Sequence, residues 1–208
     1  MTKVLVINSS ALGEASVSNK LTGELANRLK AEHPSLEITV RDIGRNPIPH
    51  LTAETVGAIR GVADNDSARA TLALSDRLIE EIREADLLVI GSPMYNFGIS
   101  STLKTWFDHV LRAGVTFRYT EAGPEGLVKG KKAVVIESRA GFYSEGPASG
   151  LDSQEPHLRT LLGFMGITDV AFVRAEKLAF GPDAAAAAIE AAAAELEALS
   201  QEELALAA

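Results

Sequence analysis

Serine side chains gather just after the first apolar run of the chain. Residues 3–7 read Lys-Val-Leu-Val-Ile, and Ser9, Ser10, Ser16 and Ser18 follow just ahead of a helical pattern. The first turn of a helix has free backbone N–H groups and the positive end of the helix dipole, which together favour an anion. The serine hydroxyls would add donors to a phosphate group. Serine also caps helices well, so the pattern alone leaves a structural role for Ser16 or Ser18 equally open.

A second segment, SPMYNFG, follows a later apolar run and contains two aromatic residues in a strand-to-helix connection. Pro93 restricts the residue before it to extended conformations, and Gly98 permits a close backbone approach or a positive φ. Tyr95 and Phe97 could lie against a planar ring, while Asn96 could donate and accept hydrogen bonds. A lone aromatic residue in such a turn more often fills an apolar gap, but the run Met-Tyr-Asn-Phe favours a flat ligand.

A third segment, SRAGFYSEGP, begins at residue 138. Gly141 would let backbone amides face a ligand, and Arg139 could pair with an acidic surface residue or contact the polar edge of a ligand. Together the three segments suit a phosphate, a flat heterocycle and a polar ring edge, which is the shape of FMN. ATP fits less well, because the chain shows neither the G-x-x-x-x-G-K motif nor an acidic metal pair, and the first segment lacks the G-x-G-x-x-G of dinucleotide folds.

Short apolar runs alternate with longer helical patterns along the chain, and these elements must position the three segments. Five such runs, each followed by a helical pattern, predict a parallel sheet covered by helices on both faces. The commonest five-strand order is 2-1-3-4-5, in which ligands bind at the carboxyl ends of strands one and three. In the second run Leu36, Ile38 and Val40 alternate and are expected to face inward. The expected strands are residues 3–7, 36–42, 85–93, 131–138 and 168–176.

Apolar residues recur at helical spacing between these runs. The connection 114–130 is expected to be long and irregular, and the C-terminal helix is rich in alanine, whose helix propensity explains it. With no internal repeat and no linker, residues 1–208 are expected to form one three-layer α/β domain. The expected helices are residues 18–32, 53–61, 68–84, one that begins at 99 or 100, residues 153–165 and one from about 183.

Composition excludes several classes of function. The net charge of −8 over 208 residues argues against binding to nucleic acid or anionic membranes. No apolar stretch approaches the ~18 residues of a membrane span, and the N-terminal run is too short for a signal peptide. Cysteine is absent, which excludes thiolate chemistry and suits a cytoplasmic location. None of the four histidines has metal-ligand spacing to another, so no metal site is expected.

Several longer motifs resemble the bacterial FMN-dependent NADH azoreductases, which are relatives of the NAD(P)H:quinone oxidoreductases in the flavodoxin-like superfamily. The motifs are KVLVINSS, SVS, PMYNF, LKTWFDHVLRAGVTFRYTEAGPEGLVKGKKA, SRAG and GFMGITDV. The similarity covers essentially the whole chain, and the part from residue 93 to 132 is specific to this family. The resemblance implies a flavodoxin-like fold and a homodimer with one FMN per subunit and its sites at the interface.

The resemblance also assigns residues by position. The FMN phosphate is assigned to Ser10, Ser16, Val17 and Ser18, and the isoalloxazine to Met94, Tyr95, Asn96 and Phe97, with Ser138, Arg139, Ala140 and Gly141 near the ring. The substrate pocket is assigned to aromatic residues resembling Tyr119 and Phe164, contributed across the interface. Two departures concern the ring edge: Ala140 stands where the family often has glycine, and Tyr143 where some relatives carry histidine. Both bear on substrate preference and on the proton donor.

The function that the resemblance implies is ping-pong hydride transfer from NADH through FMN to a quinone or an azo compound. The protein would mainly supply placement and electrostatics, with backbone amides of residues 94–97 stabilising the reduced ring. Protons would come from water, Tyr119 or Tyr143. NADH is favoured over NADPH because no arginine cluster marks a 2′-phosphate site. Alternatives are a flavodoxin-like electron carrier, a general NAD(P)H:FMN reductase and a flavin-free module that binds another phosphate.

Overall fold

A five-stranded parallel sheet forms the centre of the protein in the computed structural model, which describes residues 2–205. The strand order is β2-β1-β3-β6-β7, which confirms the predicted order 2-1-3-4-5 because β6 and β7 are the fourth and fifth strands of this sheet. The connection from β1 leads to one side of the sheet, to β2, and the chain then returns to β3 on the other side of β1. The carboxyl ends of β1 and β3 are therefore the place where ligands bind in such sheets. The strands are β1 (Lys3–Asn8), β2 (Glu37–Asp42), β3 (Leu87–Pro93), β6 (Lys132–Ser138) and β7 (Asp169–Ala175).

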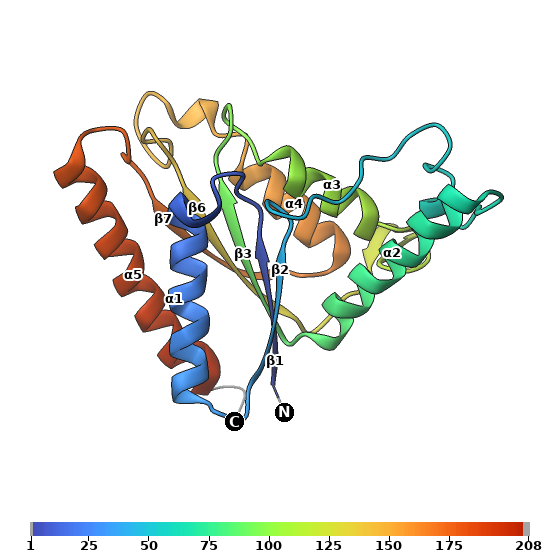
Figure 1. The fold of residues 1–208 in the computed structure, drawn as a ribbon, viewed down its shortest axis with the longest axis horizontal. Coiled ribbons are helices and arrows are strands. Elements are labelled where there is room, and N and C mark those ends of the chain that lie inside the picture. Colours follow the sequence, from blue (N-terminus) through green and yellow to red (C-terminus); the bar gives the residue numbers. More distant parts are fainter. Residues whose placement is uncertain (1, 206–208) are drawn as a thin grey trace.

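Helices cover both faces of this sheet and give the three predicted layers (Figure 1). One face carries α1 (Val17–Glu32) and α5 (Pro182–Ala205), and the other carries α2 (Asp66–Glu84), α3 (Ser101–Val110) and α4 (Glu155–Met165). Within β1, Leu5 and Ile7 pack towards α2, α3 and α4, while Val4 and Val6 pack towards α1 and α5. The central strands are buried on both faces, which explains their nearly continuous apolar sequence.

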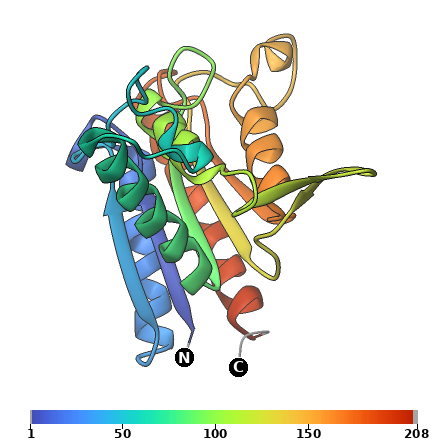
Figure 2. The ribbon, with the colours of Figure 1, turned by 90° about the vertical axis from the view of Figure 1, so that its right-hand side faces the viewer.

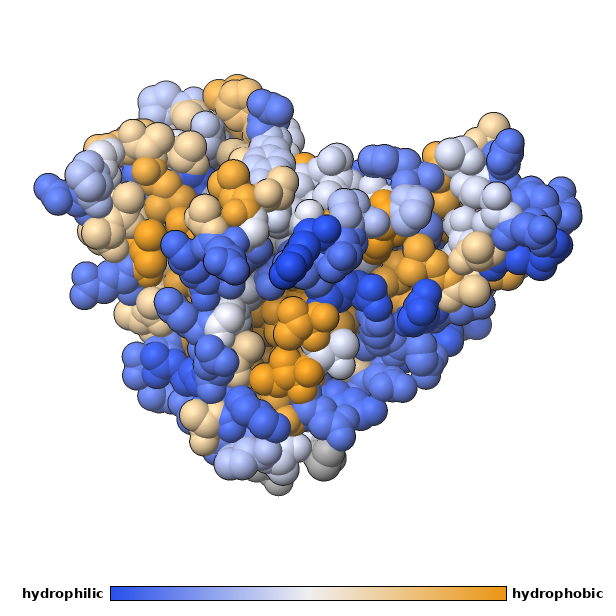
Figure 3. Space-filling view, viewed as in Figure 1, coloured by the Kyte–Doolittle hydropathy of each residue, from blue (hydrophilic) through white to orange (hydrophobic). Residues whose placement is uncertain are grey.

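Two expectations about β2 and the connection that follows it are wrong. The helix expected at residues 53–61 is only a single 3₁₀ turn, Ala58–Arg60, which ends at Gly61 with a φ of 82°. In β2, Leu36 just before the strand is buried and Ile38 is half-buried, but Val40 is 60% exposed. Val40 lies on the same side of the sheet as α1, but β2 is the edge strand and α1 packs over β1, β3 and β6. Figure 3, which has the same view as Figure 1, shows apolar surface between α1 and α2.

The connection at residues 114–130 is not irregular throughout. It contains an antiparallel hairpin, β4 (Phe117–Thr120) and β5 (Gly123–Gly126), which projects away from the sheet (Figure 2). The base of the hairpin packs closely, because a Cβ on Gly126 would lie 2.2 Å from the backbone nitrogen of Gly166 after α4. Strand β4 is only four residues long, and β5 reads Gly-Pro-Glu-Gly, which lacks the apolar alternation that predicts a strand, so the hairpin was missed.

Candidate functional site

A hollow of about 240 Å³ lies at the carboxyl ends of β1, β3 and β6, where the topology predicts a ligand site. It brings together residues from all three predicted segments, and none of these described side chains carries a formal charge. The lining residues that sequence reasoning named are Ser10, Ser16, Val17, Met94, Tyr95, Ser138 and Ala140. Sequence reasoning missed Leu12, Ala15, Pro93 and, from the connection after β7, Leu178 and Ala179.

At one end of the hollow, the serines of the first segment surround the N-terminus of α1. Ser16 is the N-cap of the helix, and its Oγ accepts a hydrogen bond from the backbone nitrogen of Asn19 at 3.3 Å. The Oγ atoms of Ser16 and Ser18 lie 3.1 Å apart, and both side chains are buried. The backbone N–H groups of Val17 and Ser18 have no carbonyl one turn earlier in the helix, as for any first-turn residue. Capping by Ser16 therefore does not use the N–H groups of Val17 and Ser18.

The connection after β1 is held against two neighbouring segments. Its Ser10 is buried, and a Cβ on Gly44 would lie 2.0 Å from the carbonyl oxygen of Ser10. The backbone nitrogens of Ile43 and Gly44 both donate to the carbonyl oxygen of Asn8, at 2.9 and 3.1 Å. The close approach at Gly44 therefore sets the position of the Ser10 backbone, because any side chain there would displace it.

The turn at Tyr95–Gly98 differs from the sequence expectation. The two end residues exchange backbone hydrogen bonds of 2.9 and 3.1 Å, and the positive φ values belong to Asn96 (48°) and Phe97 (72°), not to Gly98. Two consecutive residues in this conformation make the tight turn typical of β-hairpins. For phenylalanine a positive φ is strained, and such strain is typical of ligand-binding segments. The positive φ of Phe97 therefore lowers the folding stability of the protein.

Only part of the backbone of this turn is available to a ligand. The N–H of Met94 donates to the carbonyl oxygen of Ser138 at 2.9 Å, and that of Tyr95 donates to Gly98. The expectation that the amides of residues 94–97 all face a cofactor is therefore wrong for Met94 and Tyr95. The amides of Asn96 and Phe97 remain as candidate donors.

Two aromatic rings meet beside this turn. Phe97 is 45% exposed, and its ring meets that of Tyr143 edge to face, with the ring centres 5.9 Å apart. Tyr143 in turn lies over Gly141, because a Cβ there would come within 2.7 Å of the tyrosine hydroxyl oxygen. The carbonyl oxygen of Phe97 accepts from the backbone nitrogen of Ser153 at 2.9 Å. The second and third predicted segments thus contact each other through these side chains.

The Arg139 side chain has neither of the roles expected for it. It is fully buried beneath the third segment and does not line the hollow, although its neighbours Ser138 and Ala140 do. Its acidic partners are buried or nearly so instead of lying on the surface. They are Glu137 at 2.6 Å, Asp152 at 3.0 Å and Glu176 at 3.1 Å. A ligand at this edge would meet the backbone of the segment and not the guanidinium.

Glu137 is the most strongly perturbed acid near the site. Burial raises its pKa to about 8, although the charge of Arg139 acts in the opposite direction. Its Oε1 is buried without a hydrogen-bond partner among the described residues. Sequence reasoning missed this residue, but an acidic side chain in the apolar run from residue 133 to 138 was a usable signal, because charged residues are rarely buried unpaired.

The two aromatic residues expected in a substrate pocket lie apart from the hollow in this chain. Tyr119 on β4 is 73% exposed, and its ring meets that of Phe117 with centres 5.5 Å apart. Phe164 on α4 contacts the same Phe117 ring at 4.5 Å. The structure therefore joins Tyr119 and Phe164 in one aromatic cluster at the base of the projecting hairpin, and not with the serines.

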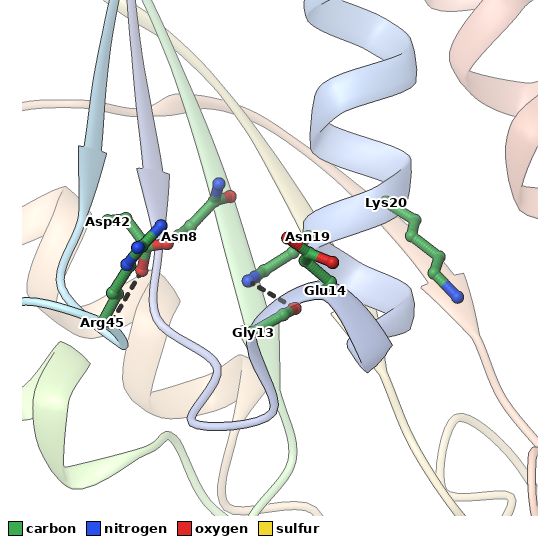
Figure 4. Close-up of a pocket in the computed structure, with 7 residues that line it drawn as sticks. All are labelled: Asn8, Gly13, Glu14, Asn19, Lys20, Asp42 and Arg45. Atoms are coloured by element: carbon green, nitrogen blue, oxygen red, sulfur yellow. Dashed lines mark hydrogen bonds between the residues drawn. The ribbon is translucent and has the colours of Figure 1, made fainter.

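A second hollow, of about 370 Å³, lies on the other side of the α1 N-terminus between β1 and β2 (Figure 4). Its walls combine Glu14 and Asp42 with Lys20 and Arg45, and Lys20 points away from the other charged groups in Figure 4. The Asn19 side chain donates to the carbonyl oxygen of Gly13 at 3.2 Å and so supports the first segment. The two acidic groups offset the two basic groups, so this hollow has no net positive charge that would favour a phosphate.

Within the described part of the chain, no group of three or more histidine, aspartate or glutamate side chains is placed to hold a metal ion. No helix among the described residues is long and apolar enough to span a bilayer.

Comparison with known proteins shows the family of the chain. A family model described as a flavodoxin-like fold matches residues 2–199. The chain belongs to the flavodoxin-like fold family. One relative in this group, named FMN-dependent NADH:quinone oxidoreductase, from Hyphomonas neptunium, is 53% identical over 189 residues, which cover 91% of each chain.

Two solved structures of the same fold family are also similar. The azoreductase from Bacillus anthracis str. Sterne has a TM-score of 0.88 at 30% identity, covering 97% of this chain and 100% of its own. An FMN-dependent NADH-azoreductase from Bacillus anthracis str. Ames Ancestor, solved in complex with FMN, has a TM-score of 0.88 at 25% identity, covering 97% and 99%. The hairpin and the site segments therefore lie in a chain that matches these enzymes along nearly its entire length.

Proposed function

We propose that this protein is an FMN-dependent NADH oxidoreductase that reduces quinones and azo compounds by two electrons. The observation that carries the proposal is the uncharged hollow at the topological switch point, with serine hydroxyls and a helix N-terminus at one end and a strained turn at the other. The relatives and solved structures described above bear names that state this activity, which supports the proposal. Residues 1–208 act as one FMN-binding domain.

The serine end of the hollow fits the phosphate of FMN. Val17 and Ser18 offer first-turn N–H groups, and the hydroxyls of Ser10, Ser16 and Ser18 offer additional donors. The lining contains no carboxylate that would repel a dianion. Because no cation lines this end either, the helix dipole and the hydrogen bonds supply the favourable electrostatics.

The rest of the hollow fits one part of a flat ring system. Pro93, Met94, Ala140 and Leu178 give it largely apolar walls. Its volume of about 240 Å³ is below the roughly 300–1,000 Å³ of pockets that enclose small ligands. A ring bound here would keep an open face, which a ping-pong reaction requires because donor and acceptor must use that face in turn.

When bound, FMN supplies the two-electron chemistry, because its ring system accepts a hydride and passes it on. The chain contributes placement and electrostatics. The backbone amides of Asn96 and Phe97, which remain available in the turn, are the candidate donors to the negative edge of the reduced ring. Tyr143, which lies over Gly141, and Tyr119 of a second subunit are candidate proton donors besides water.

A homodimer completes the site in this proposal. Tyr119 and Phe164 form one aromatic cluster outside the hollow of their own chain, and Tyr119 is largely exposed on the projecting hairpin. An exposed aromatic residue on such a projection is typical of a protein–protein contact. A second copy of the chain would carry its cluster to the open face of the flavin and form the acceptor pocket there.

Because the reaction uses NADH, the proposal places the protein in the cytoplasm.

One experiment tests the function directly. The purified protein, reconstituted with FMN, should show a flavin absorption spectrum that NADH bleaches anaerobically, faster than NADPH does, and that a quinone restores. It should also consume NADH catalytically with the quinone, which an electron carrier would not do without a reductase. A protein that stays colourless after incubation with FMN would refute the proposal. Release of free reduced FMN as the product would instead favour a general FMN reductase.

A further inference from the structure

A single buried arginine connects three walls of the site. The Nε of Arg139 donates to Oε1 of Gln154 at 3.0 Å, and its Nη1 donates to Oε1 of Glu176 at 3.1 Å. Gln154 in turn bonds strand β3, because its Nε2 donates to the carbonyl oxygen of Ser92 at 2.8 Å. The end of β3, the start of α4 and the end of β7 are thus joined through one guanidinium. Arg139 and Gln154 are fully buried, so solvent does not compete for these bonds.

Glu176 is the member of this network that faces the third segment. Its Oε1 accepts from the backbone nitrogens of Tyr143 at 2.9 Å and Ser144 at 3.1 Å, and its Oε2 accepts from the Ser144 hydroxyl. The next residue, Lys177, donates its backbone N–H to the carbonyl oxygen of Gly141 at 2.7 Å. Backbone bonds therefore hold the segment as far as Gly141, and the carboxylate extends this hold to the turn that follows.

The carboxylate is suited to this task because it stays charged. Burial alone would raise the pKa of Glu176, but hydrogen bonds from the Ser144 hydroxyl and the Tyr143 backbone, with the bond and charge of Arg139, lower it below its usual value. A carboxylate that accepts bonds from two backbone N–H groups holds them more firmly than a neutral acceptor would. The residue is only 8% exposed, so its geometry is fixed by the fold.

The turn that Glu176 holds decides where the Tyr143 ring lies. That ring covers Gly141 and meets Phe97 edge to face, so it joins the strained turn after β3 to the third segment. We propose that Glu176 is a positioning residue for the flavin site, which fixes the Tyr143–Ser144 turn and through it the aromatic edge against which the ring and the substrates lie. This inference rests on the proposed function for its flavin readouts, but the contact between Glu176 and the turn is testable without flavin.

The first test measures hydrogen exchange in the flavin-free protein. In Glu176→Ala the amides of Tyr143 and Ser144 lose their acceptor and should exchange at least about tenfold faster than in the wild type. In Glu176→Gln the side-chain oxygen can still accept from both amides, so exchange should stay within about threefold of the wild type. Unchanged exchange at both amides in Glu176→Ala would overturn the inference. If Glu176→Ala does not fold, Ser144→Ala should accelerate the same two amides to a smaller extent, and no change there would overturn it equally.

The second test measures the flavin. With FMN bound, Glu176→Ala should shift the flavin absorption bands and raise the KM for a quinone about fivefold or more, with a smaller change in kcat, since the aromatic edge is displaced while the phosphate end is not. Glu176→Gln should give values between those of Glu176→Ala and the wild type, because its oxygen still accepts from the amides but carries no charge. Glu81→Ala is a matched control, because it removes a partly buried carboxylate that bonds Arg41 away from the hollow. Wild-type spectrum and KM in Glu176→Ala would refute the positioning role, whereas a wild-type protein that binds no FMN would refute the proposed function and leave the exchange test standing.

Discussion

The phenolic oxygen of Tyr95 lies 3.1 Å from the backbone nitrogen of Ala11 and 3.4 Å from Oγ of Ser10. The side chain therefore joins the connection after β3 to the connection after β1, and these two strands are neighbours in the sheet. Sequence reasoning expected this ring to lie against a flat ligand. The structure shows that its hydroxyl accepts from Ala11 and helps to hold the serine segment in place, while the side chain also lines the hollow.

Tyr95→Phe should weaken FMN binding while leaving the fold intact. The loss of one partly buried hydrogen bond corresponds to about 1 kcal/mol, or roughly a fivefold rise in the flavin dissociation constant. Fluorescence titration of the flavin-free protein with FMN measures it. Thr160→Val is the control, because it removes an exposed hydroxyl on α4 that bonds the carbonyl oxygen of Pro156 outside the hollow, and it should leave the dissociation constant unchanged. Equal affinity in Tyr95→Phe and the wild type would show that the contact does not support the site.

Mutations of Ser16 and Ser18 should have different effects on stability, because only Ser16 caps a helix. Ser16→Ala removes the N-cap of α1 and should lower both the stability, by about 1 kcal/mol, and the affinity for FMN. Ser18→Ala should lower the affinity with a smaller effect on stability. Urea unfolding of the flavin-free protein and FMN titration measure the two quantities.

Asn65→Ala provides the control for this pair. Asn65 is the N-cap of α2 and accepts from the backbone nitrogen of Ala68, far along the chain from the hollow. Its removal should cost a similar amount of stability as Ser16→Ala and leave FMN affinity unchanged. If Ser16→Ala matches Asn65→Ala in both measurements, Ser16 is a cap alone and the phosphate has been placed wrongly.

Gly44→Ala should damage the site through backbone displacement. Its Cβ would lie 2.0 Å from the carbonyl oxygen of Ser10, so one of the two backbones must move. We expect a loss of about 1–3 kcal/mol in stability, as for other overpacked positions, together with weaker FMN binding. Gly23→Ala is the control, because a Cβ on this α1 residue meets open space and alanine favours helix. Wild-type FMN affinity in Gly44→Ala would show that the position of Ser10 does not matter.

Much of the fold was predictable because its strands are long, apolar and buried on both faces. Strands β1, β3 and β6 read as continuous apolar runs, and the parallel order follows from their alternation with helices. Strand β2 was placed correctly, but Val40 is exposed because β2 is the edge strand and α1 packs over β1, β3 and β6, which a two-residue alternation does not encode. The hairpin was missed because its strands are short and its packing depends on two glycines, Gly126 and Gly166, that are far apart in sequence.

The site was predictable in outline for a different reason. In a parallel sheet the connections after neighbouring strands meet at one edge, so three polar segments could be brought together without knowing any side-chain direction. The direction of Arg139 was not predictable, because a charged residue at a strand end is usually exposed. Its partners Asp152, Gln154 and Glu176 come from elements that only the tertiary fold brings together.

The buried cluster around Arg139 also predicts a pH dependence of stability. In the unfolded chain Glu137 ionises near pH 4.5, whereas burial keeps it protonated in the folded state up to about pH 8. The folded state therefore binds more protons than the unfolded state between these values, and its stability falls as pH rises through this window. Above about pH 8 both states are ionised and this contribution levels off. The slope is at most about 1.4 kcal/mol per pH unit for one group.

Glu137→Gln should remove this slope. The amide oxygen of glutamine can still accept from Nη2 of Arg139, but the side chain cannot ionise. The other groups that face Glu137 (Arg139, Asp152, Glu155 and Arg174) are present in both proteins, and so is His157, whose pKa is lowered mainly by burial. Their contributions cancel in the difference between the two proteins. Urea unfolding at pH 5.5, 6.5 and 7.5 should show that difference growing in favour of Glu137→Gln as the pH rises, whereas parallel curves would mean that Glu137 ionises in the folded protein as it does in the unfolded chain.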